Sequence, residues 1–191
     1  GGAEHAGNRV DVYPSAGIIN MRDETESVSL YISGRNILDG AANWNFHTLD
    51  KYTGWKDTYE GSFAKPDGFN PATDPIELKC IKYDENLFYF INGSLVLIKR
   101  VDWIKGNSCP GLYGLSAEVE FTDYAATDYE NNADALKAII SEYAYNVSVT
   151  AGDGGFVTTD KTALRKGDNL TFTVAPSAGY VLSSFKVNGV D

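Results

Sequence analysis

The sequence predicts an all-β protein in which an antiparallel sandwich is followed by one amphipathic helix and a small second β-domain. Three observations carry this prediction. Over residues 9–124 apolar residues recur with a period of two, in runs rich in Val, Ile, Tyr and Phe that Gly, Asn, Asp or Pro separate. Over 127–143 the period becomes helical. Over 145–191 alternation returns between Gly-rich turns, so a second β-domain is expected there.

The strands of the sandwich follow from the alternation. The first three are expected at 9–22, 27–33 and 42–49. The clearest segment is 76–100, where two turn signals divide three β-rich runs. One of them, Asn92-Gly93, tolerates the positive φ angles of a type I′ hairpin and predicts an antiparallel meander. A last strand is expected over 112–124, with Leu115, Ala117, Val119 and Phe121 on its buried face.

The helix is expected because apolar residues at spacings of 4, 3, 4 and 3 form one stripe. These residues are Tyr129, Ala133, Leu136, Ile140 and Tyr143. Thr127 and Glu130 stand three apart, as a capping box at its start requires. The resulting domain boundaries are 1–126 for the sandwich, 127–144 for the linking helix and 145–191 for the second β-domain.

Charge and hydropathy exclude two classes of partner. The 191 residues carry 16 Lys and Arg against 26 Asp and Glu, a net charge of -10. A nucleic-acid binder needs clustered cations to neutralise phosphates, and this sequence has no such run. It also has no apolar stretch of about 18 residues, so we expect no membrane insertion of this fragment.

The two cysteines are too few and too far apart for a zinc knuckle. Cys80 alternates with Ile76 and Leu78 on an apolar strand face, which favours a buried thiol. A disulfide between Cys80 and Cys109 is the alternative, and sequence spacing does not decide between the two.

The stretch 76–100 and the following 110–124 resemble the signature half of concanavalin A-like lectin/glucanase jelly rolls, in their laminin-G-like branch. The matching positions are Phe88, Phe90, Asn92, Gly93, Gly111, Leu112, Gly114, Phe121 and Asp123. The upstream segments 16–19 and 27–34 fit earlier strands, so the resemblance covers about 9–124. It implies a jelly-roll sandwich of lectin type, and jelly rolls of this superfamily often bind calcium.

The C-terminal segment 145–191 is similar to the divergent internalin-type B-repeats of bacterial surface proteins. The matching positions are Gly152, Gly154, Gly155, Gly167, Asp168, Pro176, Gly179, Tyr180, Asn188 and Gly189. The resemblance implies a last strand beyond Asp191. Together the two resemblances imply a secreted or cell-surface bacterial protein, with a lectin-like module followed by a stalk module.

A sugar site needs an exposed aromatic face beside polar side chains that pair with hydroxyl groups. The densest such segment is 44–59, which also holds His47 and Tyr59. The predicted ligand-binding residues are Trp44, Asn45, Asp50, Tyr52, Trp55, Asp57 and Trp103. The alternative for Trp44 is core packing together with Phe46, two residues along the same strand face.

Calcium is a possible cofactor, because Asp67, Asn70 and Asp74 place oxygen ligands in a Pro- and Gly-rich loop. A plain solvated loop is the alternative, since the spacing fits no EF-hand. Glucanases of the same fold use paired carboxylates in an E-x-D-x-x-E pattern. Neither the acidic run 23–26 nor Glu118 with Glu120 reproduces that spacing.

These features predict a noncatalytic carbohydrate-binding or adhesive module whose partner is a glycan or another ligand on a host surface. Two alternatives stay open. The sandwich could be a structural, protein-binding spacer of an adhesin, or a glycoside hydrolase whose acid pair is not recognisable in the sequence.

Overall fold

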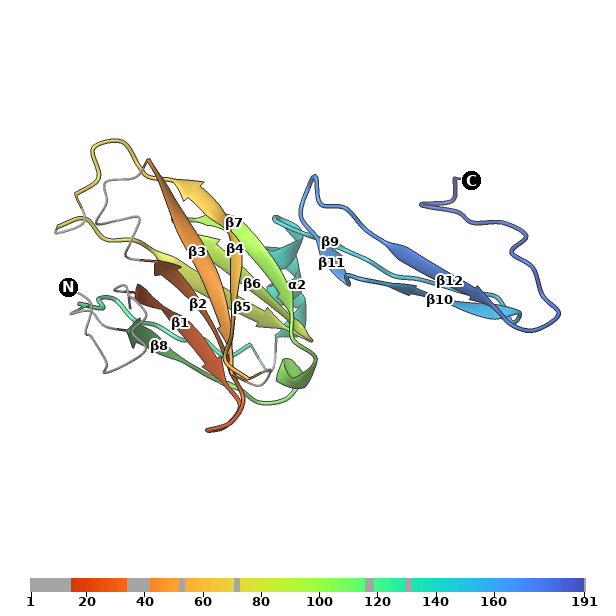
Figure 1. The fold of residues 1–191 in the computed structure, drawn as a ribbon, viewed down its shortest axis with the longest axis horizontal. Coiled ribbons are helices and arrows are strands. Elements are labelled where there is room, and N and C mark those ends of the chain that lie inside the picture. Colours follow the sequence, from red (N-terminus) through yellow and green to blue (C-terminus); the bar gives the residue numbers. More distant parts are fainter. Residues whose placement is uncertain are drawn as a thin grey trace, which may run out of the picture. The chain divides into compact units, whose positions relative to one another are not determined.

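The computed structural model describes residues 15–33, 42–51, 54–70, 73–115, 119–129 and 132–190. The chain divides after Asp128 into two compact units, and each is treated by itself below. The predicted all-β fold with a short helix is confirmed in these residues: antiparallel strands make up most of the regular structure (Figure 1).

The first unit contains a five-stranded antiparallel sheet in the order β4-β3-β2-β1-β8. Its strands are β1 (Ser15–Met21), β2 (Ser27–Ser33), β3 (Asn43–Asp50), β4 (Lys56–Ala64) and β8 (Cys109–Leu115). The first four follow one another as neighbours, and β8 returns from later in the chain to pair with β1. This return places two segments that are 88 to 100 residues apart in the sequence side by side, with Met21 opposite Cys109 at one end and Ser15 opposite Leu115 at the other.

A three-stranded antiparallel sheet forms the second layer of this unit (Figure 1). Its strands are β5 (Leu78–Tyr83), β6 (Asn86–Ile91) and β7 (Ser94–Arg100). The predicted meander and its Asn-Gly hairpin are confirmed: Asn92 and Gly93 have φ angles of 48° and 76°, as a type I′ turn requires. A short 3-10 helix, η1 (Asp102–Lys105), follows β7.

The core lies between the two sheets, because alternate residues of both point inward. From the larger sheet come Val28, Leu30, Ile32, Trp44 and Phe46. From β6 come Leu87, Tyr89 and Ile91, and from η1 and the residue before it come Ile104 and Val101. All of them are buried. Each Å² of apolar surface that these side chains remove from water stabilises the folded state by about 25 cal/mol. This layer is therefore the main source of stability.

A β-bulge in β4 resets which residues of this edge strand face the core. His47 pairs with Tyr59 and Phe46 pairs with Gly61, so Glu60 is the extra residue. Gly61 has a φ of 153°, and a Cβ there would lie 3.1 Å from the Phe46 ring. The bulge therefore lets Glu60 and Phe63, three residues apart, both lie on the inner side of the sheet.

The last predicted strand is corrected by the structure. It was expected over 112–124, but β8 begins at Cys109 and ends at Leu115, where its pairing with Ser15 of β1 also ends. Leu115 and Phe121 are exposed, not buried, while Ala117 lies outside the described residues. Residues 119–128 follow without regular structure, held in part by the Tyr124 hydroxyl, which donates to the Pro110 carbonyl oxygen at 3.2 Å.

The cysteines are both free, so the disulfide alternative is wrong. The Asn20 side-chain amide donates to Cys80 Sγ at 3.4 Å. Burial raises the pKa of the Cys80 thiol to about 12, against the smaller opposing effect of that hydrogen bond. Cys109 is exposed on β8.

We therefore expect alkylation of the native protein at pH 8 to modify Cys109 and to spare Cys80, because the thiolate is the reactive form. Intact mass after iodoacetamide treatment should show one adduct in the native protein and two in urea. Cys109→Ser should abolish native labelling. Two adducts that form at equal rates under native conditions would contradict the buried thiol.

The second unit holds a helix and two short antiparallel pairs. The elements are α2 (Ala133–Ser141), β9 (Tyr145–Asn146), β10 (Gly155–Thr159), β11 (Ala163–Leu164) and β12 (Phe172–Pro176), with β9 paired to β11 and β10 to β12. The helix begins later than predicted because Asn132 is its N-cap: its side chain accepts from the Ala135 backbone N–H at 3.2 Å. Thr127 lies before the helix, and Glu130 lies outside the described residues.

Two glycines of the second unit allow close approach of other groups. A Cβ at Gly154 would lie 2.3 Å from the Tyr180 ring, and one at Gly155 would lie 2.7 Å from the Ala175 carbonyl oxygen on β12. The Gly-Gly pair therefore admits the tyrosine on one side and the paired strand on the other. Within the described residues, the helices are all too short or too polar to cross a bilayer.

Candidate functional site

The outer face of the five-stranded sheet, opposite the core, carries a row of aromatic side chains across the strands. The register aligns Tyr59 with His47, His47 with Tyr31, Tyr31 with Gly17, and Gly17 with Tyr113. We call Tyr59, His47, Tyr31 and Tyr113 the aromatic row. It crosses the sheet from edge strand β4 to edge strand β8.

The rings of the aromatic row are in contact with one another. Tyr31 and His47 stack with ring centroids 5.4 Å apart and an interplanar angle of 15°. Tyr113 lies 5.6 Å from Tyr31 with its plane tilted by 37°. Tyr59 lies 5.6 Å from His47 and meets it edge-on at 76°. The row is therefore continuous, and Tyr59 differs in ring orientation from its neighbours.

Gly17 lies beneath the contact between Tyr31 and Tyr113. Strands that are two places apart in a sheet are separated by about 10 Å. Because the two ring centroids are only 5.6 Å apart, both tyrosines lean over the glycine between them. A Cβ at Gly17 would lie 2.0 Å from the Leu30 carbonyl oxygen, so this position is closed to any side chain unless the backbone moves.

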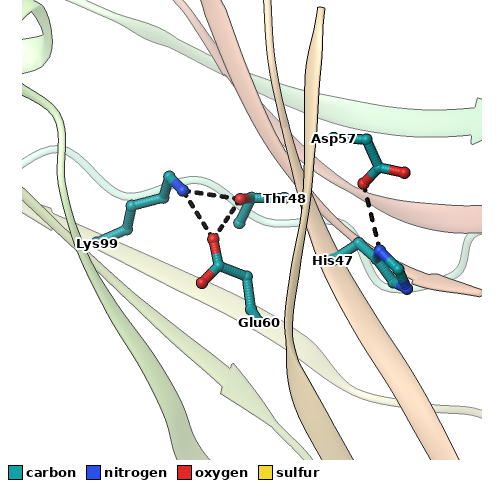
Figure 2. A network of polar contacts seen from close by, with 5 residues as sticks. All are labelled: His47, Thr48, Asp57, Glu60 and Lys99. Atoms are coloured by element: carbon teal, nitrogen blue, oxygen red, sulfur yellow. Dashed lines mark hydrogen bonds and ion pairs between the residues drawn. The ribbon is translucent and has the colours of Figure 1, made fainter.

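Asp57 supplies the charge beside the row. Its Oδ1 lies 3.2 Å from Nδ1 of His47 (Figure 2). Burial raises the pKa of the Tyr31 hydroxyl well above its ordinary value, and hydrogen bonding to Asp57 raises it further. Burial, followed by the charge of Asp57, also raises the pKa of Tyr113. Both phenols therefore stay protonated well above neutral pH, and the Tyr31 hydroxyl uses its proton in the hydrogen bond to Asp57.

Trp55 stands at the tip of the β3–β4 hairpin with 62% of its surface exposed. Its φ is 62° and follows a φ of 86° at Gly54. A positive φ is unusual for a bulky residue and is favoured only where the surrounding turn requires it. Lys51 Nζ lies 5.2 Å from the centre of the indole ring, close enough for a cation–π contact.

On the core side of the same strands lies a polar cluster that connects the two sheets. Lys99 Nζ of β7 donates to Glu60 Oε1 at 2.7 Å and to Thr48 Oγ1 at 2.8 Å, and Thr48 donates to Glu60 at 2.5 Å. Figure 2 shows this cluster on the opposite side of the strand from His47 and Asp57. It spans the layers and does not reach the outer face.

The predicted ligand-binding residues are divided by the structure. Trp44 is 0% exposed and packs edge-on against Phe69 and Phe63, with centroids 4.6 and 5.5 Å away. It belongs to the core, which was the alternative to ligand binding given for it in the sequence analysis, and it presents no surface to a ligand. Trp103 is half-buried against the core on η1.

The remaining predicted residues lie around the hairpin. Asn45 and Asp57 lie on the outer face of β3 and β4, and Trp55 is exposed at the tip. Asp50 pairs with Lys56 and, two residues along the strand from Thr48, lies on the same inward side of β3. Tyr52 lies outside the described residues. The structure therefore brings Asn45, Asp57 and His47 together on one face and separates them from Trp44 and Trp103.

Sequence reasoning did not find Tyr31, Tyr113, Glu60 or Lys99. Tyr31 alternates with buried Leu30 and Ile32, a parity that signals the outer face. Its contact with Tyr113 depends on β8 pairing with β1, which no local pattern specifies. Lys99 shares the parity of Leu97, and a charge at such an inward position signals a buried partner.

The loop proposed for calcium is held by its own hydrogen bonds. Asp74 accepts from the Asn70 backbone N–H at 2.8 Å and from the Thr73 hydroxyl at 3.0 Å, while Asp67 is exposed nearby. The part of the chain that the structure describes brings together no three His, Cys, Asp or Glu side chains suited to a metal. Calcium binding stays a prediction.

The acidic run considered for a hydrolase forms a turn. Asp23 accepts from the backbone N–H and the hydroxyl of Thr25, both at 2.7 Å, and from the Glu26 N–H at 2.9 Å. The Thr25 hydroxyl, followed by the backbone groups, lowers the pKa of Asp23 to about 2. Arg22 pairs with Glu26. Glu118 lies outside the described residues.

The first unit is thus an antiparallel sandwich with an aromatic outer face.

Comparison with known proteins identifies a family for part of the second unit. Residues 145–191 match the family described as Divergent InlB B-repeat domain, as their Gly and Tyr positions predict. This match indicates a module of bacterial surface proteins. No curated protein and no solved structure matches the chain.

Proposed function

We propose that the first unit is a noncatalytic glycan-binding module of a bacterial surface protein, with its site on the outer face of β3 and β4. The observation that carries the proposal is the set of exposed groups there. Tyr59 is 58% exposed, and the Asp57 carboxylate beside it is largely open to water. Of the segment 44–59, in which the sequence predicts a sugar site, only the residues that face outward belong to the proposed site.

The chemistry of this face suits a sugar. A pyranose ring presents a face of C–H groups, which packs against an aromatic ring, and a rim of hydroxyl groups. Tyr59 supplies the ring, and Asp57 supplies acceptors for two neighbouring hydroxyls. Asn45 adds a donor and an acceptor on the same face. Trp55 offers a second aromatic ring two residues before Asp57.

The outer face does not favour glycoside hydrolysis. Retaining enzymes need two carboxyl groups about 5 Å apart, and inverting enzymes place them somewhat farther. On the five described strands of this sheet, alternation puts a single carboxylate, Asp57, on the outer face. Asp50 and Glu60 have inward parity. The proposal is therefore binding without catalysis.

We expect neutral oligosaccharides to quench or shift the tryptophan fluorescence of the protein, because Trp55 is the exposed indole at the site. Asp57→Ala should weaken binding by about tenfold or more, the size expected for loss of hydrogen bonds to a charged group. Tyr59→Ala should weaken it by a similar factor. Calorimetric titration measures both effects.

Tyr145→Ala is the matched control, since Tyr145 is 62% exposed but lies in the second unit. It should bind as the unmodified protein does. Trp55→Phe should remove the fluorescence response while calorimetric binding persists. A panel of neutral glycans that gives no heat and no fluorescence change, with and without calcium, would refute the proposal and leave the spacer alternative.

A further inference from the structure

We propose that the aromatic row binds an internal stretch of an extended, neutral polysaccharide laid across the strands, with its outermost subsites at Tyr59 and Tyr113. This inference rests on the proposed function and specifies how the ligand is held. It assigns a binding role to β8, which lies at the far edge of the sheet from Trp55 and Asp57.

The length of the row argues for several subsites. Successive ring centroids lie 5.6, 5.4 and 5.6 Å apart, so the row reaches at most about 17 Å from Tyr59 to Tyr113, which is longer than one sugar ring. The rings touch along its whole course, and the lean of Tyr31 and Tyr113 over Gly17 bridges the one position without a side chain. A ligand that contacts both ends must therefore be a chain.

The flanks of the row argue for a ligand that crosses the strands. Two residues away along the strands, Tyr31 is flanked by Ser29 and Ser33, and Tyr113 by Gly111 on one side. None of these positions, nor Leu115 on the other side of Tyr113, carries an aromatic ring. A chain that followed a strand would leave the rings after one contact, whereas a chain across the strands stays on them.

The ends of the row argue for an internal stretch of the chain. Tyr59 lies on β4 and Tyr113 on β8, the two edge strands of the sheet. In the part of the chain that the structure describes, no further strand pairs with either edge strand, and the proposed ligand continues past both of them. Recognition of a chain terminus would need a wall at one end of the row.

Charge argues for a neutral polymer. Asp57 is the carboxylate on this face of the strands, and the whole chain has a net charge of -10. An acidic polysaccharide would be repelled both by the Asp57 carboxylate and by the net negative charge of the protein. The protonated hydroxyl of Tyr113 is a donor suited to uncharged hydroxyl or ether oxygens, whereas that of Tyr31 donates to Asp57 and leaves its oxygen as an acceptor.

The test uses the full chain and a length series of neutral oligosaccharides. Native gels cast with soluble neutral polysaccharides, such as mixed-linkage β-glucan, galactomannan or xyloglucan, first identify a polymer that retards migration. Calorimetry with its oligosaccharides should then show affinity rising at least about tenfold from the disaccharide to the tetrasaccharide or pentasaccharide, the length that matches the row. Reduction of the chain end should not alter binding.

Tyr113→Ala should lower the affinity for the longer oligosaccharides by about tenfold and leave disaccharide binding unchanged, because only the longer ligands reach β8. Tyr113→Phe should lose less affinity than Tyr113→Ala, and Tyr145→Ala should lose none. Melting temperatures of all variants report whether the row only stabilises the sheet through cross-strand aromatic pairs.

The outcomes separate the two proposals. If Asp57→Ala abolishes binding but length and Tyr113→Ala have no effect, the internal-chain inference falls and the glycan site stands. If Tyr113→Ala lowers the melting temperature and weakens the binding of every ligand by the same factor, the row is structural and the inference falls. Tighter retention by an acidic polymer such as polygalacturonate overturns the neutral assignment. Absence of retention by every polymer, together with no binding of short sugars, overturns both proposals.

Discussion

Replacing Trp44 by alanine should lower the free energy of unfolding of the first unit by about 4 kcal/mol, the middle of the range for loss of a buried aromatic side chain. The indole is fully buried between the sheets and packs edge-on against Phe63 and Phe69. Alanine would leave a cavity that these rings cannot fill without leaving their own positions. Urea denaturation followed by circular dichroism measures the change.

Two variants make this measurement specific. Trp44→Phe should cost about 1 to 2 kcal/mol, since it keeps an aromatic ring and the indole N–H has no hydrogen-bond partner among the described residues. Trp55→Ala should change stability by less than about 0.5 kcal/mol because Trp55 is exposed. Equal losses for Trp44→Ala and Trp55→Ala would contradict the separation of core from surface.

This pair of tryptophans also shows how far sequence reasoning reaches. Both lie in the segment predicted to bind, and composition alone does not separate them. Alternation places Trp44 on the inward face of its strand with Phe46 and Thr48. Trp55 instead follows Gly54, which marks a turn. The strands of the meander and the Asn-Gly turn were predictable for the same reason, since hydrophobic alternation and turn chemistry are local signals.

The rest of the site depends on pairings between distant segments. Tyr31 and Tyr113 are neighbours only because β8 returns to β1, and the choice of that edge is a property of the whole sheet. The bulge at Glu60 inverts the parity of half of β4, so alternation read along this strand alone misassigns its faces. Long-range register, not local preference, positions these groups.

The C-terminal segment illustrates the opposite case. Its glycines could be recognised from spacing, and the structure gives the reason: at Gly154 a side chain would enter the Tyr180 ring, and at Gly155 it would enter the β12 backbone. A close approach that only glycine permits leaves a sequence pattern. The aromatic row has no such pattern apart from Gly17, because many residues can occupy an open sheet face.

Replacing Lys99 by alanine should destabilise the first unit by about 2 to 3 kcal/mol, below the value for a fully buried pair because some surface remains exposed. Its ammonium donates to Glu60 and Thr48, and the side chains of Lys99 and Glu60 are 21% and 15% exposed. Without Lys99, the Glu60 carboxylate keeps one short hydrogen bond from Thr48 and loses its counter-charge. Urea denaturation compares the variants.

The double variant Lys99→Met with Glu60→Leu distinguishes a stabilising ion pair from an unpaired charge. Removing both charges should recover most of the stability lost in Lys99→Ala, since well-packed apolar groups often replace a buried pair without loss. Glycan binding should survive in every variant that folds, because the cluster and Asp57 lie on opposite sides of the sheet. If Lys99→Ala leaves stability unchanged yet weakens binding, the two faces of β3 and β4 are coupled, and the separation of scaffold from recognition surface does not hold.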